Sequence, residues 1–417
     1  MEHEPVVERF LRYVGVSSQS RESVPDSDIA PTSPGQMELA RMLKNELEEL
    51  FRKNNVQAQI DLRSNALLVC LIPATEGFEK APVLWLSAHL DTYETGSPDI
   101  RPQFHDYESG DITLAPGVVI TAKELQMFEH ETIITSDGTS VLGADDKAGL
   151  AGIMEAIELT HGFSIEHGEI ILVFFPDEEL GRFKAKQLPS DLLEKKGIFL
   201  TVDGCAMGEV DIGCYSGRKV TVTFEGRDAH PGPDGHKIAS AIYAATSFVE
   251  LLAKKPAPWN KDADGGYVFS TAIQGSTEKC VVTCIPRAFK DNDSLKKVEE
   301  LEALAETATR IWPGTKFSCE VEHTYTSTKD AIDANPWCLE PITKAIEKTT
   351  GKKPILQEVP AGTDGAMLNL VFPSIPSPNI GTGAHNIHQL TEFICAEDLC
   401  TLQQILCDII GNVARIT

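Results

Sequence analysis

Acidic side chains follow an apolar segment of this sequence directly, where a strand is expected to end. The run FFPDEELG places Asp177, Glu178 and Glu179 immediately after the apolar part of segment 168–176. That segment is rich in β-branched and aromatic residues and is bounded by turn residues, which is typical of a buried strand. Because adjacent carboxylates repel one another, either exposure to solvent in a loop or a bound cation must account for them.

Other metal-ligand residue types stand at the ends of further expected elements. His89 and Asp91 follow the strand-like run APVLWLSA, and Asp203 closes GIFLTVDG. Asp145 lies in GADDKAG, directly before an expected helix, and His388 lies in NIHQLTEF, near a short strand. In open α/β sheets, functional groups gather at the carboxyl ends of the strands. These separate segments are therefore expected to converge.

None of these residues indicates a site by itself. A lone His-x-Asp sequence is usually a surface pair, and Asp145-Asp146 could simply form the N-cap of the following helix. Together, two imidazoles and several carboxylates are suitable ligands for Zn²⁺, with Mn²⁺ and Co²⁺ as substitutes. One carboxylate can bridge two ions about 3.5–4 Å apart. The set as a whole predicts a site for two metal ions.

The elements that must hold these residues alternate between strand and helix. Amphipathic or small-residue helices are expected over 36–53 and 147–160, and the small residues of the second helix permit close packing. Strands are expected over 65–73, 81–90, 168–176 and 197–204. This alternation predicts an α/β domain with a mixed, largely parallel sheet flanked by helices. Between 92 and 140 we expect irregular structure, with one strand pair around VVITA and ETIITSDG.

The pattern changes after about residue 214. Strand, helix, two strands, helix and strand follow in the order β-α-β-β-α-β, which predicts a self-contained smaller α+β unit over 215–325. The chain then returns to its first style and ends in a helix over 396–413. We therefore expect one α/β domain formed by 1–214 and 326–417 and interrupted by an inserted domain.

Composition limits the partners and the compartment. Acidic residues outnumber basic ones by 62 to 37, and the formal net charge of −25 argues against nucleic acids and anionic membranes as partners. The sequence contains no apolar run of the ~20 residues that a membrane-spanning helix needs. Its first residues, MEHEPVVERFLRYVGV, lack the apolar core of a signal peptide. Ten cysteines without a CxxC pair indicate reduced thiols, so a cytoplasmic location is expected.

Seven segments of the chain carry a family resemblance: LSAHLDT, GADDKAG, FFPDEELG, TVDG, DAHPGPDG, GTDGA and NIHQLTEF. In content and order they resemble the co-catalytic zinc aminopeptidases of the peptidase T group, within the M20 metallopeptidases. The resemblance extends through nearly the whole chain. It implies a two-zinc catalytic domain with an inserted lid or dimerisation domain, and a homodimer.

The resemblance also implies roles for the five candidate metal ligands. One zinc ion would be held by His89 and Asp203, and the other by Glu179 and His388. Asp145 would bridge the two ions.

Further roles concern the reaction itself. Asp91 would orient His89. Glu178 would be the general base, which takes a proton from water activated between the ions and passes it to the departing amine. Asp177 is left as a turn residue. This division explains why two glutamates are adjacent: one binds metal and the other moves a proton.

Two residues of the inserted domain would contact the substrate. His230, in DAHPGPDG, would stabilise the oxyanion in the active site of the neighbouring subunit, and Arg287, in CVVTCIPRAF, would bind a substrate carboxylate. Without the resemblance, His230 would be interpreted as a turn residue and Arg287 as a surface residue.

The sequence departs from the family pattern where substrate is bound. Pro360 and Ala361 stand where the family tends to carry an arginine and a glycine, and the run after Asp203 lacks an expected asparagine. The favoured function is an aminopeptidase that releases the N-terminal residue of short peptides, tripeptides foremost. The alternatives are a dipeptidase or N-acyl-amino-acid deacylase of the M20 type and a non-catalytic metal-binding protein. The presence of Glu178 argues against the last.

Overall fold

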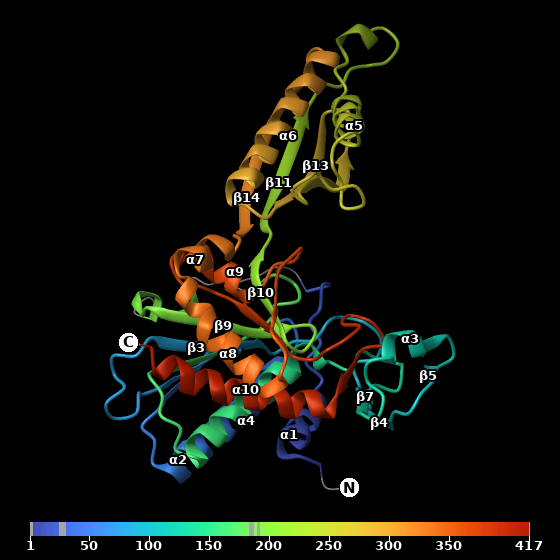
Figure 1. Ribbon diagram of the computed structural model, residues 1–417. Coiled ribbons are helices and arrows are strands. Elements are labelled where there is room, and N and C mark those ends of the chain that lie inside the picture. Colours follow the sequence, from blue (N-terminus) through green and yellow to red (C-terminus); the bar gives the residue numbers. More distant parts are fainter. Residues whose placement is uncertain (1–2, 25–30, 183–186, 190–191, 417) are drawn as a thin grey trace.

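The computed structural model describes residues 3–24, 31–182, 187–189 and 192–416. Figure 1 shows a broad α/β body from which a smaller unit of strands and helices projects. The larger body contains both ends of the described chain, and the smaller unit is formed by a single continuous segment between them.

The larger body is built on an eight-stranded mixed sheet. In spatial order the strands are β1 (Gln59–Leu62), β2 (Leu68–Ile72), β8 (Ile170–Phe175), β3 (Val83–His89), β9 (Gly197–Gly204), β16 (Asn379–Gly381), β10 (Glu209–Cys214) and β15 (Ile355–Val359). Strands β8, β3, β9 and β16 run parallel, whereas β1 and β2 are antiparallel to their neighbours. The predicted mixed sheet is confirmed.

Both faces of this sheet are covered. In β3, Leu84 and Leu86 contribute to the core beneath one set of helices, while Trp85 belongs to a separate core on the opposite face. The first face carries α1 (Pro5–Val14), α2 (Pro34–Asn54), α4 (Ala144–Gly162), α8 (Leu339–Thr350) and α10 (Ala396–Ala414). The opposite face carries α9 (Asp364–Asn369). Burial on both faces explains why these strands are continuously apolar in sequence.

Helix α4 lies unusually close to the sheet. A Cβ atom added at Gly149 would lie 2.0 Å from the carbonyl oxygen of Val202 in β9, so no larger residue fits there. A Cβ atom at Gly152 would lie 2.7 Å from the side chain of Leu402 in α10. The small residues of α4 thus permit the close packing expected from the sequence. This packing holds α4, whose second residue is Asp145, against β9 and α10.

The projecting unit has its own sheet and its own core. Its strands, in spatial order, are β12 (Tyr267–Gly275), β13 (Lys279–Ala288), β11 (Ser216–Glu225) and β14 (Lys316–Tyr325). Helices α5 (Ala241–Leu252) and α6 (Asp291–Ile311) pack on one face, where Phe224, Phe248 and Leu301 form part of a core distinct from those of the larger body. We propose on this basis that residues 215–325 form the inserted domain.

The segment between 92 and 140 corrects one expectation. It contains β4 (Gln103–Asp106), β5 (Ile112–Ala115), β6 (Val118–Ile120), α3 (Ala122–Leu125) and β7 (Thr132–Thr135). The expected pairing of VVITA with ETIITSDG is wrong, because β6 pairs with β5 across Gly117, whose φ of 82° suits a tight turn, whereas β7 pairs with β4 and β17 (Phe393–Cys395). The partner β17 is remote in sequence.

Short helices complete the described elements: η2 (Leu192–Glu194), η3 (Gly235–Lys237), α7 (Lys329–Ala334) and η4 (Pro336–Cys338). All ten cysteines are free, and seven of them are buried. Over the described ranges, none of the helices combines the length and the apolar character needed to cross a bilayer.

A buried arginine connects three helices below the sheet. Arg9 of α1 donates from Nε to Glu155 of α4 at 2.9 Å and from Nη2 to Glu158 at 2.5 Å, and it also pairs with Glu46 of α2. Both Arg9 and Glu155 are buried, whereas Arg12, one turn further along α1, pairs with Glu46 in an exposed position.

Replacing Arg9 should therefore destabilise the larger body. Arg9→Met leaves Glu155 buried without its cation, and we expect a loss of about 3–5 kcal/mol in the free energy of unfolding. The matched control Arg12→Met removes an exposed pair and should cost about 0–1 kcal/mol. Urea denaturation of both variants measures the difference, and equal midpoints would contradict the assigned role of Arg9.

Candidate metal centre

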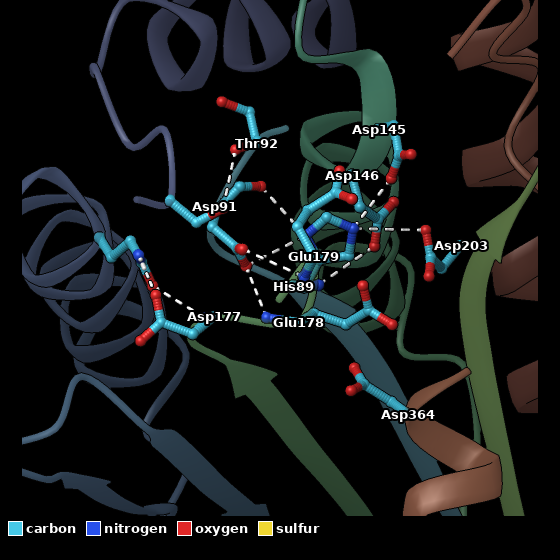
Figure 2. A network of polar contacts seen from close by, with 12 residues as sticks. His89, Asp91, Thr92, Asp145, Asp146, Asp177, Glu178, Glu179, Asp203 and Asp364 are labelled. Atoms are coloured by element: carbon cyan, nitrogen blue, oxygen red, sulfur yellow. Dashed lines mark hydrogen bonds and ion pairs between the residues drawn. The ribbon is translucent and has the colours of Figure 1, made fainter. Parts of the chain in front are cut away.

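The parallel strands bring the candidate residues to one edge of the sheet. His89 is the last residue of β3, Asp203 is the penultimate residue of β9, and Glu178 and Glu179 follow the end of β8. Since β8, β3 and β9 are parallel neighbours, their carboxyl ends meet. Asp145, at the start of α4, lies over the same edge (Figure 2).

Two groups of metal-ligand atoms share Asp145. The Nε2 atom of His89 lies 2.8 Å from Oδ1 of Asp145 and 3.5 Å from Oδ1 of Asp203. The Nε2 atom of His388 lies 3.1 Å from Oδ2 of Asp145 and 2.9 Å from Oε2 of Glu179. Within each group the ligand-type atoms lie within 4.8 Å of one another. The five residues thus converge in two sets of three, while their binding of metal stays a prediction.

Asp91 contacts both sides of the centre. The Nδ1 atom of His89 lies 3.0 Å from the carbonyl oxygen of Asp91 and 3.4 Å from its carboxylate. The same carboxylate accepts the backbone N–H groups of Glu178 at 3.0 Å and Glu179 at 3.2 Å (Figure 2). Asp91 therefore lies where it can orient His89, and that role stays a prediction. Its hold on the glutamate segment was not foreseen, because it joins residues far apart in sequence.

Asp177 faces away from the centre. Its φ of 54° turns the chain sharply after β8, and its buried carboxylate accepts the backbone N–H of Thr32 and the side-chain amide of Gln36. The amide of Gln36 accepts in turn from the backbone N–H of Asp177 at 3.0 Å. Asp177 thus anchors the turn to the start of α2, which supports the structural role expected of it and leaves Glu178 and Glu179 on the other side.

The adjacent glutamates differ in their surroundings. Glu179 contacts His388, whereas Figure 2 shows the carboxylate of Glu178 reaching toward the space between Asp203 and Asp364. Burial raises the pKa of Glu178 well above its ordinary value, and the neighbouring carboxylates, Asp364 foremost, raise it further. Burial and Asp145 raise the pKa of Glu179 to about 7.

The electrostatics of the centre show a shortage of positive charge. Burial raises the pKa of Asp203 to about 6. Burial opposes the charged form of the histidines, but hydrogen bonds to Asp145 and Glu179 nevertheless raise the pKa of His388 to about 10. Carboxylates crowded together in a low-dielectric site favour a bound cation.

Several residues of the centre were missed as site residues. Asp146 is buried and accepts the backbone N–H groups of His89 and Gly149. Glu392 accepts those of Gly143 at 2.7 Å and Asp145 at 3.0 Å. Asp146 lies in GADDKAG and Glu392 in NIHQLTEF. Their closeness in sequence to the ligand residues Asp145 and His388 was the one sign that could have identified them as part of the site.

Asp364 and Tyr93 were also missed. Asp364, in GTDGA, is buried with one carboxylate oxygen unpaired, and Ser87 approaches its other oxygen at 3.5 Å. Tyr93 stacks on His388. Its residue type is not a usual metal ligand, so no signal in the sequence pointed to it.

Arg287 lies at the base of the projecting unit. It pairs with Gly217 at the start of β11, and its guanidinium lies 5.2 Å from the ring centre of Tyr325. A Cβ atom at Gly362 would lie 3.2 Å from the ring of Tyr325, and Gly362 lines the same cavity as the metal-ligand residues. That cavity has a volume of about 190 Å³. Arg287 is thus one side chain removed from the cavity wall.

His230 is not brought to the centre of its own chain. It is exposed and follows β11, a ten-residue strand that runs from the larger body toward the tip of the projecting unit (Figure 1). A strand of that length spans about 30 Å. The Nδ1 atom of His230 accepts the backbone N–H of Gly232 at 3.2 Å, so its contacts are local.

Comparisons with known proteins agree with this architecture. The sequence profile of peptidase family M20/M25/M40 matches residues 142–412. Proteins named peptidase T are similar over all or nearly all of their length. That of Desulfitobacterium hafniense is 33% identical with 93% of each chain covered, and that of Streptococcus agalactiae is 32% identical with 100% of each chain covered. Among solved structures, the aminopeptidase PepT of Bacillus cereus shares the fold, with a TM-score of 0.74, 24% identity and 100% of each chain covered.

The chain therefore belongs to peptidase family M20/M25/M40. Within that family it is a metallopeptidase of the peptidase T group, the aminopeptidases to which the sequence motifs pointed. The resemblance inferred from those motifs is confirmed.

The different surroundings of the two glutamates generate a test. Glu178→Gln should lower kcat by about 10²–10⁴-fold, the range for a general base, with bound metal unchanged. Glu179→Gln should instead lower the occupancy of one metal position, because Glu179 is the carboxylate in contact with His388. Elemental analysis and steady-state kinetics on the same preparations measure both effects. Equal loss of metal in the two variants would contradict the division of roles.

Proposed function

We propose that this centre holds two zinc ions and that the protein releases the N-terminal residue of short peptides, tripeptides foremost. The observation that carries the proposal is the position of Asp145, whose two carboxylate oxygens face two different histidines. His89 and Asp203 would hold one ion, Glu179 and His388 the other, and Asp145 both. One carboxylate shared by two sets of ligands suits two metal ions.

The chemistry of the donors fits this assignment. Imidazole nitrogen and carboxylate oxygen are suitable ligands for Zn²⁺, and Mn²⁺ or Co²⁺ can substitute. The Oε1 atom of Glu179 is buried without a hydrogen-bond partner, so a ligand-type oxygen remains free within the centre. Bound ions would also neutralise the carboxylates whose pKa values are raised here.

The residues of the chain supply the proton transfer. When bound, two such ions lower the pKa of water and polarise a carbonyl oxygen. Glu178 accepts a proton from the attacking water on its carboxylate and gives it to the amine nitrogen that leaves. Asp91 keeps the segment of Glu178 in place through two backbone hydrogen bonds. Burial raises the pKa of Glu178, which makes its carboxylate a stronger acceptor for the proton of water.

The two termini of the peptide substrate would be recognised by different parts of the protein, the projecting unit and the larger body. The guanidinium of Arg287 can bind a peptide carboxylate through two parallel hydrogen bonds. Its place near the cavity wall supports an anchor for short peptides, since the carboxylate of a long peptide would lie out of reach. The acidic surroundings of the centre favour a free N-terminal ammonium at the other end of the substrate.

We further propose that the active protein is a homodimer in which His230 completes the site of the partner subunit. His230 lies on the far part of the projecting unit, away from its own centre. The sheet of that unit has β12 and β14 as its two edge strands. Large apolar side chains are exposed on it, at Ile242, Tyr243, Ile273, Ile311 and Val321. An edge strand and exposed apolar residues are features that a second copy can cover.

The proposed location is the cytoplasm. Seven buried free thiols suit a reducing compartment, where cysteines remain unpaired. The net charge of −25 argues against nucleic acid or anionic membranes as partners, so peptide and a second subunit are the proposed partners.

Blocking each end of a tripeptide tests the proposed polarity. Acetylation of the N-terminus should abolish cleavage, and removal of metal by a chelator should abolish turnover of the free peptide. Amidation of the C-terminus should raise KM in the wild type but much less in Arg287→Ala, because the variant has already lost the carboxylate anchor. The control Arg310→Ala, an exposed arginine on α6, should keep the full effect of amidation.

Other outcomes of the same assays support the alternatives. Efficient hydrolysis of the acetylated peptide would favour an N-acyl-amino-acid deacylase, and a preference for dipeptides would favour a dipeptidase. Normal metal content without hydrolysis of any of these substrates would indicate a non-catalytic metal-binding protein.

Mixing two inactive variants tests the crossing of subunits. His230→Ala and Glu178→Ala should each be inactive alone, yet in a mixed dimer one site receives an intact Glu178 and an intact His230. We therefore expect partial recovery of activity after subunit exchange, measured against each variant mixed with itself. Absence of recovery, with exchange verified by mass spectrometry, would place the action of His230 within its own chain or remove it altogether.

A further inference from the structure

The two histidines of the centre are held in different ways. His89 is buried, and its Nδ1 atom lies within hydrogen-bond distance of the carbonyl oxygen of Asp91. His388 is 39% exposed at its side chain, and only its Nε2 atom contacts the centre. Among the residues that the structure describes, Nδ1 of His388 has no hydrogen-bond partner. In a metal-binding histidine this second ring nitrogen usually donates to a carboxylate, a backbone carbonyl or water, and the choice of partner sets how firmly the ring is held.

The ring of Tyr93 occupies the position where this restraint is needed. Its centre lies 4.2 Å from that of the His388 imidazole, and the two planes are inclined by 6°. A flat contact of this kind restricts the tilt of the imidazole plane, in which Nε2 lies, without a hydrogen bond. Tyr93 is itself exposed, at 39%.

The backbone of Tyr93 is fixed to the strand that carries His89. Only Leu90, Asp91 and Thr92 separate it from His89, and Thr92 forms a bridge with Gln19. The carbonyl of Thr92 accepts the N–H of Ser20 at 3.0 Å, and that of Tyr93 accepts the side-chain amide of Gln19 at 3.3 Å. Tyr93 thus extends the rigid end of β3 toward the other half of the centre.

The segment of His388 needs this support. His388 has a φ of 63°, a backbone conformation that residues other than glycine rarely adopt. Its neighbour Leu390 packs against the chain near Gly96, where an added Cβ atom would lie 3.0 Å from the leucine side chain. The loop of Tyr93 and the loop of His388 are therefore in contact at a second point as well.

We propose that Tyr93 is a positioning residue for the second metal position. Its ring orients the imidazole of His388 and takes the role that the hydrogen bond from His89 to the Asp91 carbonyl oxygen plays for His89. The proposal rests on the proposed function, because it assumes that His388 binds metal. It assigns Tyr93 no contact with substrate and no part in proton transfer.

Stepwise zinc titration of the apoprotein against a chelating indicator tests the proposal and yields a dissociation constant for each position. Tyr93→Leu keeps apolar bulk but loses the flat ring, and we expect about 10–100-fold weaker binding at one position and unchanged binding at the other. Tyr93→Phe keeps the ring and should bind as the wild type does. Tyr93→Gln, a polar variant close in size to Tyr93→Leu, also lacks the ring and should show the same weakening. It replaces the leucine variant in the titration if that variant folds poorly.

The matched control is Phe163→Leu. Phe163 is an aromatic residue, 75% exposed, at the opposite end of α4 from Asp145. The Phe163→Leu variant should leave both zinc dissociation constants unchanged. A change in this control would reveal a general effect of losing an aromatic ring. Circular dichroism of each variant verifies folding before titration.

A double-mutant cycle assigns the effect to His388. In a His388→Ala background, Tyr93→Leu should cause no further loss of zinc affinity, because the group that it positions is gone. Additive losses, equal weakening of both positions, or unchanged binding in Tyr93→Leu would each overturn the proposal. Binding of fewer than two zinc ions by the wild type would instead contradict the proposed function, and the same titration separates the two failures.

Discussion

The carboxylate of Asp145 sets the geometry on which the rest of the centre depends. Its two oxygens face histidines from opposite parts of the sequence, so its position must be fixed in relation to both. The backbone achieves this in two ways. Glu392 accepts the backbone N–H groups of Gly143 and Asp145 at the start of α4. Gly149, which has no side chain, allows α4 to lie directly on β9. A shift of this helix would separate the two halves of the centre.

Concentrating so many carboxylates at one edge requires compensation. Part of it comes from backbone N–H groups, as in the two hydrogen bonds that Asp91 accepts. Another part comes from Lys147, which is buried in α4 and donates to the carbonyl of Val16 at 2.7 Å. Burial lowers the pKa of Lys147 to about 7, while Glu392 and Asp91 oppose that change. Glu178, Glu179 and Asp203 retain raised pKa values, a condition that favours a bound cation.

The projecting unit holds apart the two residues that we propose contact the substrate. Arg287 lies at its base, one side chain from the cavity, whereas His230 follows the outward strand β11. A rigid sheet with its own core can hold both residues at fixed positions relative to each other. The two residues lie toward opposite ends of its strands, in keeping with the proposal that Arg287 serves the chain's own centre and His230 that of a partner subunit.

The sequence by itself determined the fold class and the convergence of the five ligand-type residues. Continuous apolar strands imply burial on both faces of the sheet. Because the strands that end at or near His89, Glu179 and Asp203 are parallel, their carboxyl ends bring these residues to one edge of the sheet. Tertiary structure alone decided the pairing of β7 with β17, the hold of Asp91 on the glutamate segment and the stacking of Tyr93 on His388. These contacts join loops remote in sequence. Local residue patterns record burial and period, but they carry no information about which side chain faces which across a gap.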